Sequence, residues 1–316
     1  MRSADSPLVS VIVVYYKRRD TIEKCLDSIF QQDYMELEVI VVDNHAQGDL
    51  RQITQARGYE VNLIEPCENL GACGGRNAGI RAAHGEILVF LDDDVSFASA
   101  FELSKIVRAF DRRPDAHVLA FRICDPETGE IRQREWCHTR PWQEFRDTSF
   151  ETIWFGEGAS AFRQQVFAAC GHYYEPLFYG AEGHDLVLRL LDRGFRMVYA
   201  PEIRVSHWAS EKGRTAARQY YYYTRNFIWM AVKDYPLWDG LIFLVPKILM
   251  MLYFSWRSST YRPFFGGMWD GLKGLRRIWP DRRPVRRSTL GYVDQQENWR
   301  PGFMVRLARH RHKPLI

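Results

Sequence analysis

The 316-residue sequence lacks several features that would assign it to particular protein classes. It contains no CxxC pair, and its six cysteines (25, 67, 73, 124, 137 and 170) follow no metal-ligand spacing, which argues against a zinc or redox site. It has no internal repeat and no low-complexity segment, so a repeat architecture is not expected. The N-terminal apolar run is short and strand-like, with no cleavage site after it. We therefore expect no signal peptide, reduced thiols and a cytoplasmic location.

No apolar run reaches the roughly 20 residues that a membrane-spanning helix needs. The longest candidate, LIFLVPKILMMLYFSW at residues 241–256, also contains Pro246 and Lys247. It therefore predicts an interfacial or re-entrant segment rather than a clean transmembrane helix. The alternative is a helical subdomain packed on the rest of the protein.

The net charge of +4 is unevenly distributed. Residues 241–316 carry 15 Lys and Arg against 4 Asp and Glu, a net of +11, so the first 240 residues sum to −7. A basic tail on an acidic body indicates contact with an anionic surface. The tryptophans at 238, 256, 269 and 279 suit the headgroup level of a membrane. We therefore expect an anionic membrane partner, a peripheral position at the inner face of the cell membrane, and no nucleic-acid partner.

Segments typical of strands and helices alternate through the first half of the chain. Residues 8–16 and 37–42 are rich in β-branched residues and predict buried strands. Asp20 predicts a helix start, with Glu23 as its capping-box partner. The alternation predicts an α/β fold with a mostly parallel central sheet flanked by helices. Ligands of such folds bind at the carboxyl ends of the strands.

The second half is less regular. Residues 125–150 predict a long excursion, 184–193 an amphipathic helix, and 195–200 a strand that ends before Pro201. The character changes again near residue 214. We therefore expect a nucleotide-binding and catalytic domain at 1–213 and a basic, aromatic-rich helical extension at 214–316 that associates with membranes.

The run FLDDDV, residues 90–95, is the most informative motif. An apolar strand ends in three aspartates, and the alternation of an extended chain predicts that Asp92 and Asp94 point the same way while Asp93 points the other. Two like-charged carboxylates on one side favour a hard divalent cation, which would leave positions open for phosphate oxygens. An acidic turn after a strand is the alternative.

Two further segments suggest nucleotide contacts. Asp43 follows a predicted strand and can accept a hydrogen bond from a base or a ribose, although a turn residue is the alternative. The segment NLGACGGRNAGI places Gly71, Gly74 and Gly75 before a predicted helix, with Arg76 at its start. Such a segment allows close approach to a diphosphate. Its spacing matches neither the P-loop nor the dinucleotide fingerprint, and a plain flexible loop is the alternative.

Over roughly residues 8–210 the order of motifs resembles the inverting glycosyltransferases of family 2, which have the GT-A fold. The resemblance depends on VSVIVVYYKRRDTIEKCLDSI, LEVIVVDN, ENLGACGGRNAGI, FLDDDV, EGHDLVLRL and PEIRVSH. Within the family, the chain resembles bacterial polysaccharide and rhamnosyl-type transferases. The resemblance implies sugar transfer from a UDP, dTDP or GDP donor to a lipid-linked or saccharide acceptor in envelope or polysaccharide synthesis, with Mg²⁺ or Mn²⁺ as cofactor.

The resemblance also implies roles for individual residues. Nucleotide-sugar contacts would come from Tyr15, Asp43, Gly71, Gly75, Arg76, Asp92 and Asp93, and metal ligation from Asp92, Asp94 and His207. The segment GEGASAF, residues 156–162, resembles the acceptor-side wall of the family, where small residues leave room for the sugar.

The expected catalytic base lies in a segment that departs from the family pattern. Family members usually carry two adjacent acids, one further residue and then Asp-Leu, whereas this chain has Glu182-Gly183-His184-Asp185-Leu186. Glu182 is the expected base. Asp185 is the alternative, unless it only forms an i,i+4 ion pair with Arg189.

Two other functions compete with this hypothesis. A nucleotidyltransferase would also have an α/β fold and an acidic metal site, but it usually carries a glycine-rich basic loop after its first strand, where this chain reads YYKRRDT. A non-catalytic membrane-surface protein would use the basic tail alone, and it would leave the acidic triplet and Glu182 unexplained.

Overall fold

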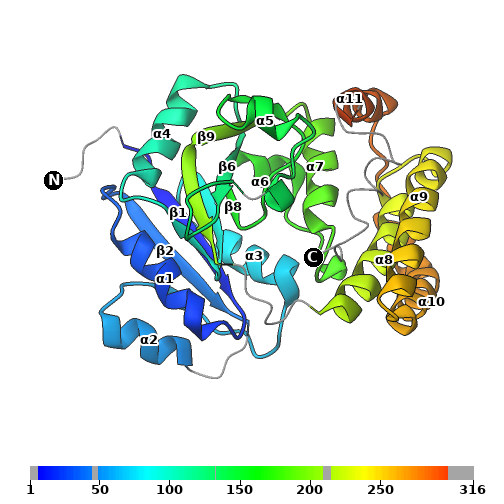
Figure 1. Ribbon diagram of the computed structural model, residues 1–316, viewed down its shortest axis with the longest axis horizontal. Coiled ribbons are helices and arrows are strands. Elements are labelled where there is room, and N and C mark those ends of the chain that lie inside the picture. The colour runs from blue at the N-terminus through cyan, green and yellow to red at the C-terminus, as the bar shows by residue number, and fades with distance from the viewer. Residues whose placement is uncertain (1–5, 45–48, 132, 209–214, 298–316) are drawn as a thin grey trace.

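The computed structural model describes residues 6–44, 49–131, 133–208 and 215–297. A nine-stranded sheet lies between helices (Figure 1), in the order β3-β2-β1-β4-β8-β6-β9-β5, with β7 also paired to β9. The strands are β1 (Val9–Tyr15), β2 (Leu37–Asp43), β3 (Asn62–Ile64), β4 (Ile87–Asp92), β5 (Val95–Phe97), β6 (Val118–Cys124), β7 (Phe150–Thr152), β8 (Ala159–Arg163) and β9 (Met197–His207).

Helices cover both faces of the sheet. The helices are α1 (Arg19–Phe30), α2 (Asp49–Arg57), α3 (Gly71–Ala82), α4 (Glu102–Arg112), α5 (Trp142–Phe145), α6 (Gln165–Cys170), α7 (Glu182–Asp192), α8 (Ala216–Lys233), α9 (Leu237–Arg257), α10 (Tyr261–Ile278) and α11 (Arg287–Glu297). One hydrophobic core joins the sheet to α1, α2 and α4, and a second joins it to α3, α6, α7 and α8. The predicted α/β architecture is confirmed.

The sheet combines a parallel half with strands of mixed direction. β3, β2, β1 and β4 run parallel, as do β6 and β9. β8 runs antiparallel to both β4 and β6 because the chain reaches it through the excursion at 125–150 rather than through a crossover helix.

The glycine-rich segment differs from its prediction. Helix α3 begins at Gly71, so Gly74, Gly75 and Arg76 lie inside the helix rather than before it. A Cβ on Gly75 would lie 2.7 Å from Val14 Cγ1 and 2.7 Å from Asn44 Nδ2. The glycines therefore let α3 lie directly against β1, which outweighs their poor helix propensity.

Two other local predictions are wrong. Helix α1 has Arg18 at its N-cap with no side-chain capping bond, so Asp20 and Glu23 form no capping box there. Strand β9 continues through Pro201 to His207, because the β6–β9 register shifts between Phe121 and Arg122 and leaves the proline in a bulge that needs no donor.

The C-terminal helices form a separate layer at the edge of the molecule (Figure 1). Helix α8 packs on α9 and α10, and its buried residues, including Phe227 and Met230, join the core shared with α3 and α7. The predicted domain boundary between 213 and 214 lies outside the described residues. Helix α9 has 21 residues, longer than the apolar run at 241–256, and by length and composition alone it could cross a membrane; the predicted interfacial position stays a prediction.

Candidate active site

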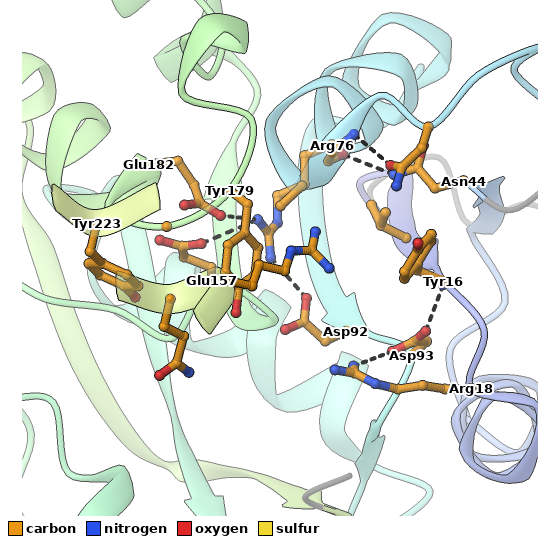
Figure 2. A pocket seen from close by; sticks show the side chains of 17 residues that line it. Tyr16, Arg18, Asn44, Arg76, Asp92, Asp93, Glu157, Tyr179, Glu182 and Tyr223 are labelled. Carbon is orange, nitrogen blue, oxygen red and sulfur yellow. Dashed lines mark hydrogen bonds and ion pairs between the residues drawn. The ribbon is translucent and has the colours of Figure 1, made fainter. Parts of the chain in front are cut away.

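A cavity of about 340 Å³ opens at the carboxyl ends of β1 and β4. Its walls come from segments far apart in the chain: the ends of β1 and β4 with the residues that follow them, Asn44 after β2, the start of α3 with the loop before it, Glu157 in the loop before β8, the start of α7 with the residues before it, and one face of α8. Figure 2 shows acidic and basic side chains from these elements pointing toward one another. The crevice lies where ligands are expected for a sheet of this kind.

Arg76 is the electrostatic centre of the cavity. Its buried guanidinium lies 2.9 Å from Asp92 Oδ1, 3.2 Å from Glu157 Oε2 and 3.2 Å from Glu182 Oε1. Three carboxylates from distant parts of the sequence thus share one cation (Figure 2). Arg76 lines the cavity as predicted, but it contacts carboxylates, and its contact with a diphosphate stays a prediction.

Glu157 and Glu182 form a pair of acids beside Arg76. Glu157 Oε1 accepts a 2.7 Å hydrogen bond from the Gly183 N–H at the start of α7. Burial raises the pKa of Glu157 well above its usual range, the neighbouring Glu182 raises it further, and Arg76 opposes both effects. The pair therefore places two carboxyl groups beside one buried cation, and Glu157 is the one whose proton affinity is raised.

The acidic run divides into two parts. β4 ends at Asp92, which pairs with Arg76, while Asp93 and Asp94 lie 2.7 Å and 3.0 Å from the guanidinium of Arg18. The expectation that Asp92 and Asp94 point the same way is wrong, because the strand alternation stops at Asp92 and a turn follows. Burial raises the pKa of Asp93 to about 7, although Arg18 opposes the shift.

His207 ends β9 beside the second part of the run. Its Nε2 lies 3.5 Å from Asp94 Oδ2, and its Nδ1 lies 2.7 Å from Glu135 Oε2. Burial lowers the pKa of His207, but hydrogen bonds to Asp94 and Glu135 outweigh it and raise the pKa to about 9. A carboxylate that holds one imidazole nitrogen while the other faces a second carboxylate is typical of metal-binding histidines.

The predicted metal ligands converge only in part. Asp94 and His207 face each other, but Asp92 pairs with Arg76, and among the described residues no three His, Cys, Asp or Glu side chains form a metal-binding group. Of the predicted ligands only Asp94 and His207 therefore lie together, and their binding of a metal stays a prediction. A carboxylate oxygen from Asp94 and an imidazole nitrogen from His207 are ligands that fit Mg²⁺ or Mn²⁺.

The nucleotide side of the cavity differs from the sequence prediction at Tyr15. Tyr15 is fully buried and donates a 2.7 Å hydrogen bond to Asp49, while Val14 and Tyr16 line the cavity. The cause is the alternation of side chains along β1, which turns Tyr15 toward α1 and α2. Asp43 is also buried, at the end of β2, and its predicted contact with the base stays a prediction.

The start of α3 is held by neighbouring segments. The Asn44 amide donates to Gly71 O at 2.9 Å, and Phe178 O accepts from the Ala72 N–H at 2.8 Å. One backbone amide at this helix start is therefore used in a hydrogen bond within the protein, whereas we expected this segment to face a diphosphate. Gly71 lines the cavity in a left-handed conformation (φ 70°), and Phe178 O would lie 2.4 Å from a Cβ there.

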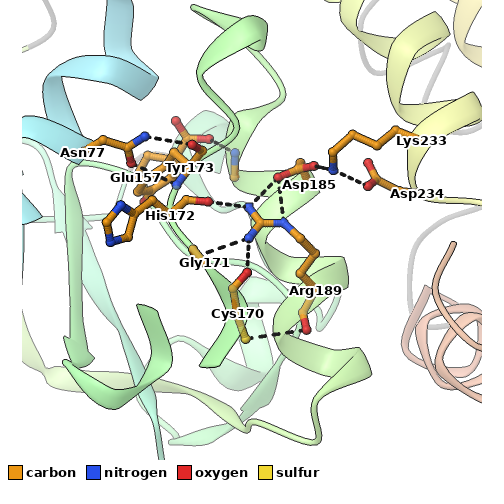
Figure 3. Close-up of polar contacts among 11 residues, drawn as sticks. Asn77, Glu157, Cys170, Gly171, His172, Tyr173, Asp185, Arg189, Lys233 and Asp234 are labelled. Carbon is orange, nitrogen blue, oxygen red and sulfur yellow. Dashed lines mark hydrogen bonds and ion pairs between the residues drawn. The ribbon is translucent and has the colours of Figure 1, made fainter. Parts of the chain in front are cut away.

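Asp185 lies outside the cavity lining. Its fully buried carboxylate accepts from Arg189 at 2.6 Å and 3.0 Å and from Lys233, as Figure 3 shows. Arg189 and Lys233 outweigh the effect of burial and hold the pKa of Asp185 below its usual range. Asp185 therefore joins α7 to α8 through buried ion pairs and does not line the cavity, and its role as the alternative base stays a prediction.

Several cavity residues were missed by sequence reasoning. Helix α8 contributes Arg218, Gln219 and Tyr223 to the wall, and the Arg218 guanidinium lies 4.4 Å from the ring centroid of Tyr179. The predicted extension therefore forms part of the site. Arg18, Asn44 and Glu157 were also missed. An acid between two glycines, at 156–158, is the one local signal that could have identified Glu157.

A comparison with protein families decides the classification. The model described as glycosyl transferase family 2 matches residues 10–171, about half of the chain. The protein belongs to glycosyl transferase family 2. This membership confirms the resemblance seen in the motifs and makes the nucleotidyltransferase alternative wrong.

Relatives of this family 2 protein include enzymes of lipid-linked glycan synthesis. GalNAc(5)-diNAcBac-PP-undecaprenol beta-1,3-glucosyltransferase of Campylobacter jejuni is 36% identical over 92 residues, which cover 28% of this chain and 30% of that protein. Matches to the first three curated relatives span between 30% and 62% of those proteins' own lengths.

Solved structures share the fold. S. aureus TarS 1–349 in complex with UDP has a TM-score of 0.59 and 18% identity, covering 92% of this chain and 88% of that one. The mannosyltransferase PcManGT from Pyrobaculum calidifontis, in complex with GDP-Man and Mn²⁺, has a TM-score of 0.52 and 18% identity, covering 99% and 83%. The expected GT-A fold is confirmed.

Proposed function

We propose that this protein transfers a hexose, with inversion at the anomeric carbon, from a nucleotide-diphosphate sugar to a hydroxyl of a lipid-linked or saccharide acceptor. One observation carries the proposal. A cavity at the carboxyl ends of the strands brings Asp93, which shares Arg18 with the proposed metal ligand Asp94, together with the Glu157–Glu182 pair. A metal–diphosphate and a proton acceptor are the two groups that direct displacement at a sugar carbon requires.

The chain has residues for the donor. Arg18, Arg218, Tyr16 and Asn44 line the cavity. The two arginines would face the diphosphate, and Tyr16 and Asn44 would contact the nucleobase. Asp94 and His207 would hold Mg²⁺ or Mn²⁺, with Glu135 orienting the imidazole. When bound, such a cation neutralises charge on the leaving diphosphate.

The acceptor hydroxyl would attack from the opposite side. A single displacement with inversion needs a proton acceptor near the attacking oxygen, and a carboxylate can serve as one. The Glu157–Glu182 pair lies across the cavity from Arg18, with Arg76 between the pair and Asp92 (Figure 2). Arg76 keeps the two acids close together without leaving their charge uncompensated.

The proposed reaction is tested by donor turnover. Purified protein is incubated with UDP-glucose, UDP-N-acetylglucosamine, dTDP-rhamnose or GDP-mannose, a short-chain polyprenyl-diphosphate sugar in detergent, and Mn²⁺. We expect release of the nucleoside diphosphate from one donor, which EDTA abolishes, and a product of inverted anomeric configuration. Turnover that persists in EDTA, or no turnover of any donor, would contradict the proposal.

A lipid-linked acceptor lies in a membrane, so the enzyme needs a surface that binds membranes. Helices α9 and α10 present an apolar surface of this kind. Eight large apolar side chains of α9 are between 39% and 70% exposed: Leu237, Trp238, Leu241, Ile242, Val245, Leu249, Leu252 and Trp256. Lys247 instead lies inward, with its Nζ 5.0 Å from the Phe227 ring and 4.9 Å from the Phe243 ring. A helix in water turns its charges outward, so this reversed arrangement supports contact with lipid.

Helix α10 extends the apolar surface of α9. Its residues Phe265, Trp269 and Leu272 are more than half exposed, and Trp279 follows just beyond the helix. The exposed cations Lys273, Arg276 and Arg277 lie in the same stretch. By length and composition alone α9 could also cross a membrane. We propose that α9 and α10 dock on the cytoplasmic face of an anionic membrane and bring the cavity to its acceptor.

Charged substitutions on this surface should prevent docking. The triple variant Leu241→Asp, Val245→Asp and Leu249→Asp should lower partitioning onto phosphatidylcholine–phosphatidylglycerol vesicles by at least about 100-fold, because each apolar side chain contributes roughly 1.5–3 kcal/mol. Flotation measures the bound fraction. The matched control is Phe101→Asp, which changes an equally exposed apolar residue next to α4. Equal loss in the control, or unchanged binding by the triple variant, would contradict the proposed surface.

A further inference from the structure

The second acid that family members usually carry is absent at Gly183, and another carboxylate occupies its space. A Cβ built on Gly183 would lie 2.3 Å from Glu157 Oε1 and 3.0 Å from Glu157 Cδ. A side chain at position 183 would therefore overlap the Glu157 carboxyl group. Glu157, which lies 26 residues earlier in the chain, fills the volume that a residue at 183 would fill.

Two contacts hold Glu157 in this place. The Gly183 N–H donates to Glu157 Oε1 at 2.7 Å, and Arg76 lies 3.2 Å from Glu157 Oε2. The glycine that follows Glu157 makes this approach possible, because a Cβ on Gly158 would lie 2.2 Å from Asp92 Cγ. The loop thus lies directly against the end of β4, and the Glu157 carboxyl group is preorganised rather than mobile.

The two acids of the pair differ in access to the cavity. The Glu157 side chain is 27% exposed and the Glu182 side chain only 4%, although both line the cavity. Glu182 Oε2 is buried and has no hydrogen-bond partner among the described residues. An incoming hydroxyl therefore reaches Glu157 first. Burial and the neighbouring Glu182 both raise the pKa of Glu157, which makes it a stronger proton acceptor than an ordinary glutamate carboxylate.

We propose that Glu157 is the general base, which replaces the absent acid at position 183, and that Glu182 and Arg76 position it. This inference rests on the proposed transferase function. In the step, the Glu157 carboxylate takes the proton of the acceptor hydroxyl as that oxygen forms a bond to the anomeric carbon. The bond from the anomeric carbon to the donor phosphate oxygen breaks, and its electron pair leaves with the nucleoside diphosphate.

Replacement and relocation of the acid test the assignment. Glu157→Gln should lower kcat about 100-fold for the donor that wild type turns over, and it should remove the acid-side limb of the kcat–pH profile. Nucleotide affinity and thermal stability should stay near wild type, since the amide oxygen still accepts from Gly183. Glu157→Ala combined with Gly183→Asp should regain at least about tenfold over Glu157→Ala alone, because the acid returns from the other chain segment. Glu127→Gln, on an exposed loop, is the control.

Three results would overturn the assignment: a Glu157→Gln variant whose kcat stays within about threefold of wild type, an acid-side limb that survives in that variant, or no recovery in the relocated variant. The second and third results would leave Glu157 as a partner of Arg76 only. Failure of the proposed function is recognised separately, because wild-type protein would then turn over none of the four donors.

Discussion

Asp94→Asn should reduce sugar transfer by about 10³-fold while the protein stays folded. The substitution keeps the shape of the side chain and removes its charge. Asp94 is fully buried, 3.5 Å from His207 and 3.0 Å from Arg18, so no other group can take its position. The asparagine variant should also lose the Mn²⁺-dependent part of its nucleotide affinity and keep the metal-independent part.

The measurement pairs steady-state transfer with calorimetric nucleotide binding, with and without Mn²⁺. Asp115→Asn is the matched control, since Asp115 forms an exposed ion pair with Arg196 away from the cavity. A thermal melt verifies that both variants are folded. An Asp94→Asn variant that keeps more than about a tenth of wild-type transfer would show that the metal is held elsewhere or is not needed.

Asp185→Asn should destabilise the fold by about 3–5 kcal/mol and leave the activity of the folded fraction nearly unchanged. The fully buried Asp185 carboxylate compensates Arg189 and Lys233, and its removal leaves Lys233 paired only with Asp234, at 2.6 Å. Removing one partner of a buried ion pair lowers the free energy of unfolding by more than the intact pair contributes to it, because the remaining charges stay desolvated.

The contribution of Asp185 to the free energy of unfolding should decrease as the pH falls below about 4. Its pKa is held below the usual range in the folded protein, so its contribution is complete above the unfolded-state pKa of about 4. That contribution is lost as the pH falls further, through the lower pKa of the folded state. The difference in unfolding free energy between wild type and Asp185→Asn, from urea denaturation, should therefore be constant from pH 5 to pH 7 and shrink below about pH 4.

The control for this prediction lies on the same helix. Asp192→Asn changes a partly exposed carboxylate that pairs with Arg286, and it should cost no more than about 1 kcal/mol. A variant at Asp185 that keeps its stability but loses transfer would instead support the catalytic role that the sequence left open for this residue.

The fold was largely predictable because its signals are local. The β-branched runs became β1 and β2, and the apolar run before the acidic triplet became β4. The prediction for residues 71–76 was wrong because glycine marks loops locally, while here the close approach of α3 to Val14 and Asn44 decides the conformation. The sequence predicted a nucleotide contact from Tyr15 rather than Tyr16. The alternation of side chains along a strand shows which residues share a face but not which face contacts the ligand.

The candidate site was less predictable because it is assembled from distant segments. Arg76 lies 106 residues from Glu182 and 81 from Glu157 along the chain, and no local pattern reports such contacts. The role of α8 in the cavity wall was hidden for the same reason, since the stretch from residue 214 was assigned to a membrane-associated extension and Arg218 is part of no motif.

The most direct measurement is calorimetric titration of UDP, dTDP and GDP into the purified protein, with and without Mn²⁺. We expect one nucleotide to bind and its affinity to rise by at least about tenfold when Mn²⁺ is present, since the diphosphate would add ligands to those that we propose Asp94 and His207 supply. Binding of none of the three by the folded protein, or equal affinity with and without the metal, would contradict a metal-dependent nucleotide-sugar site.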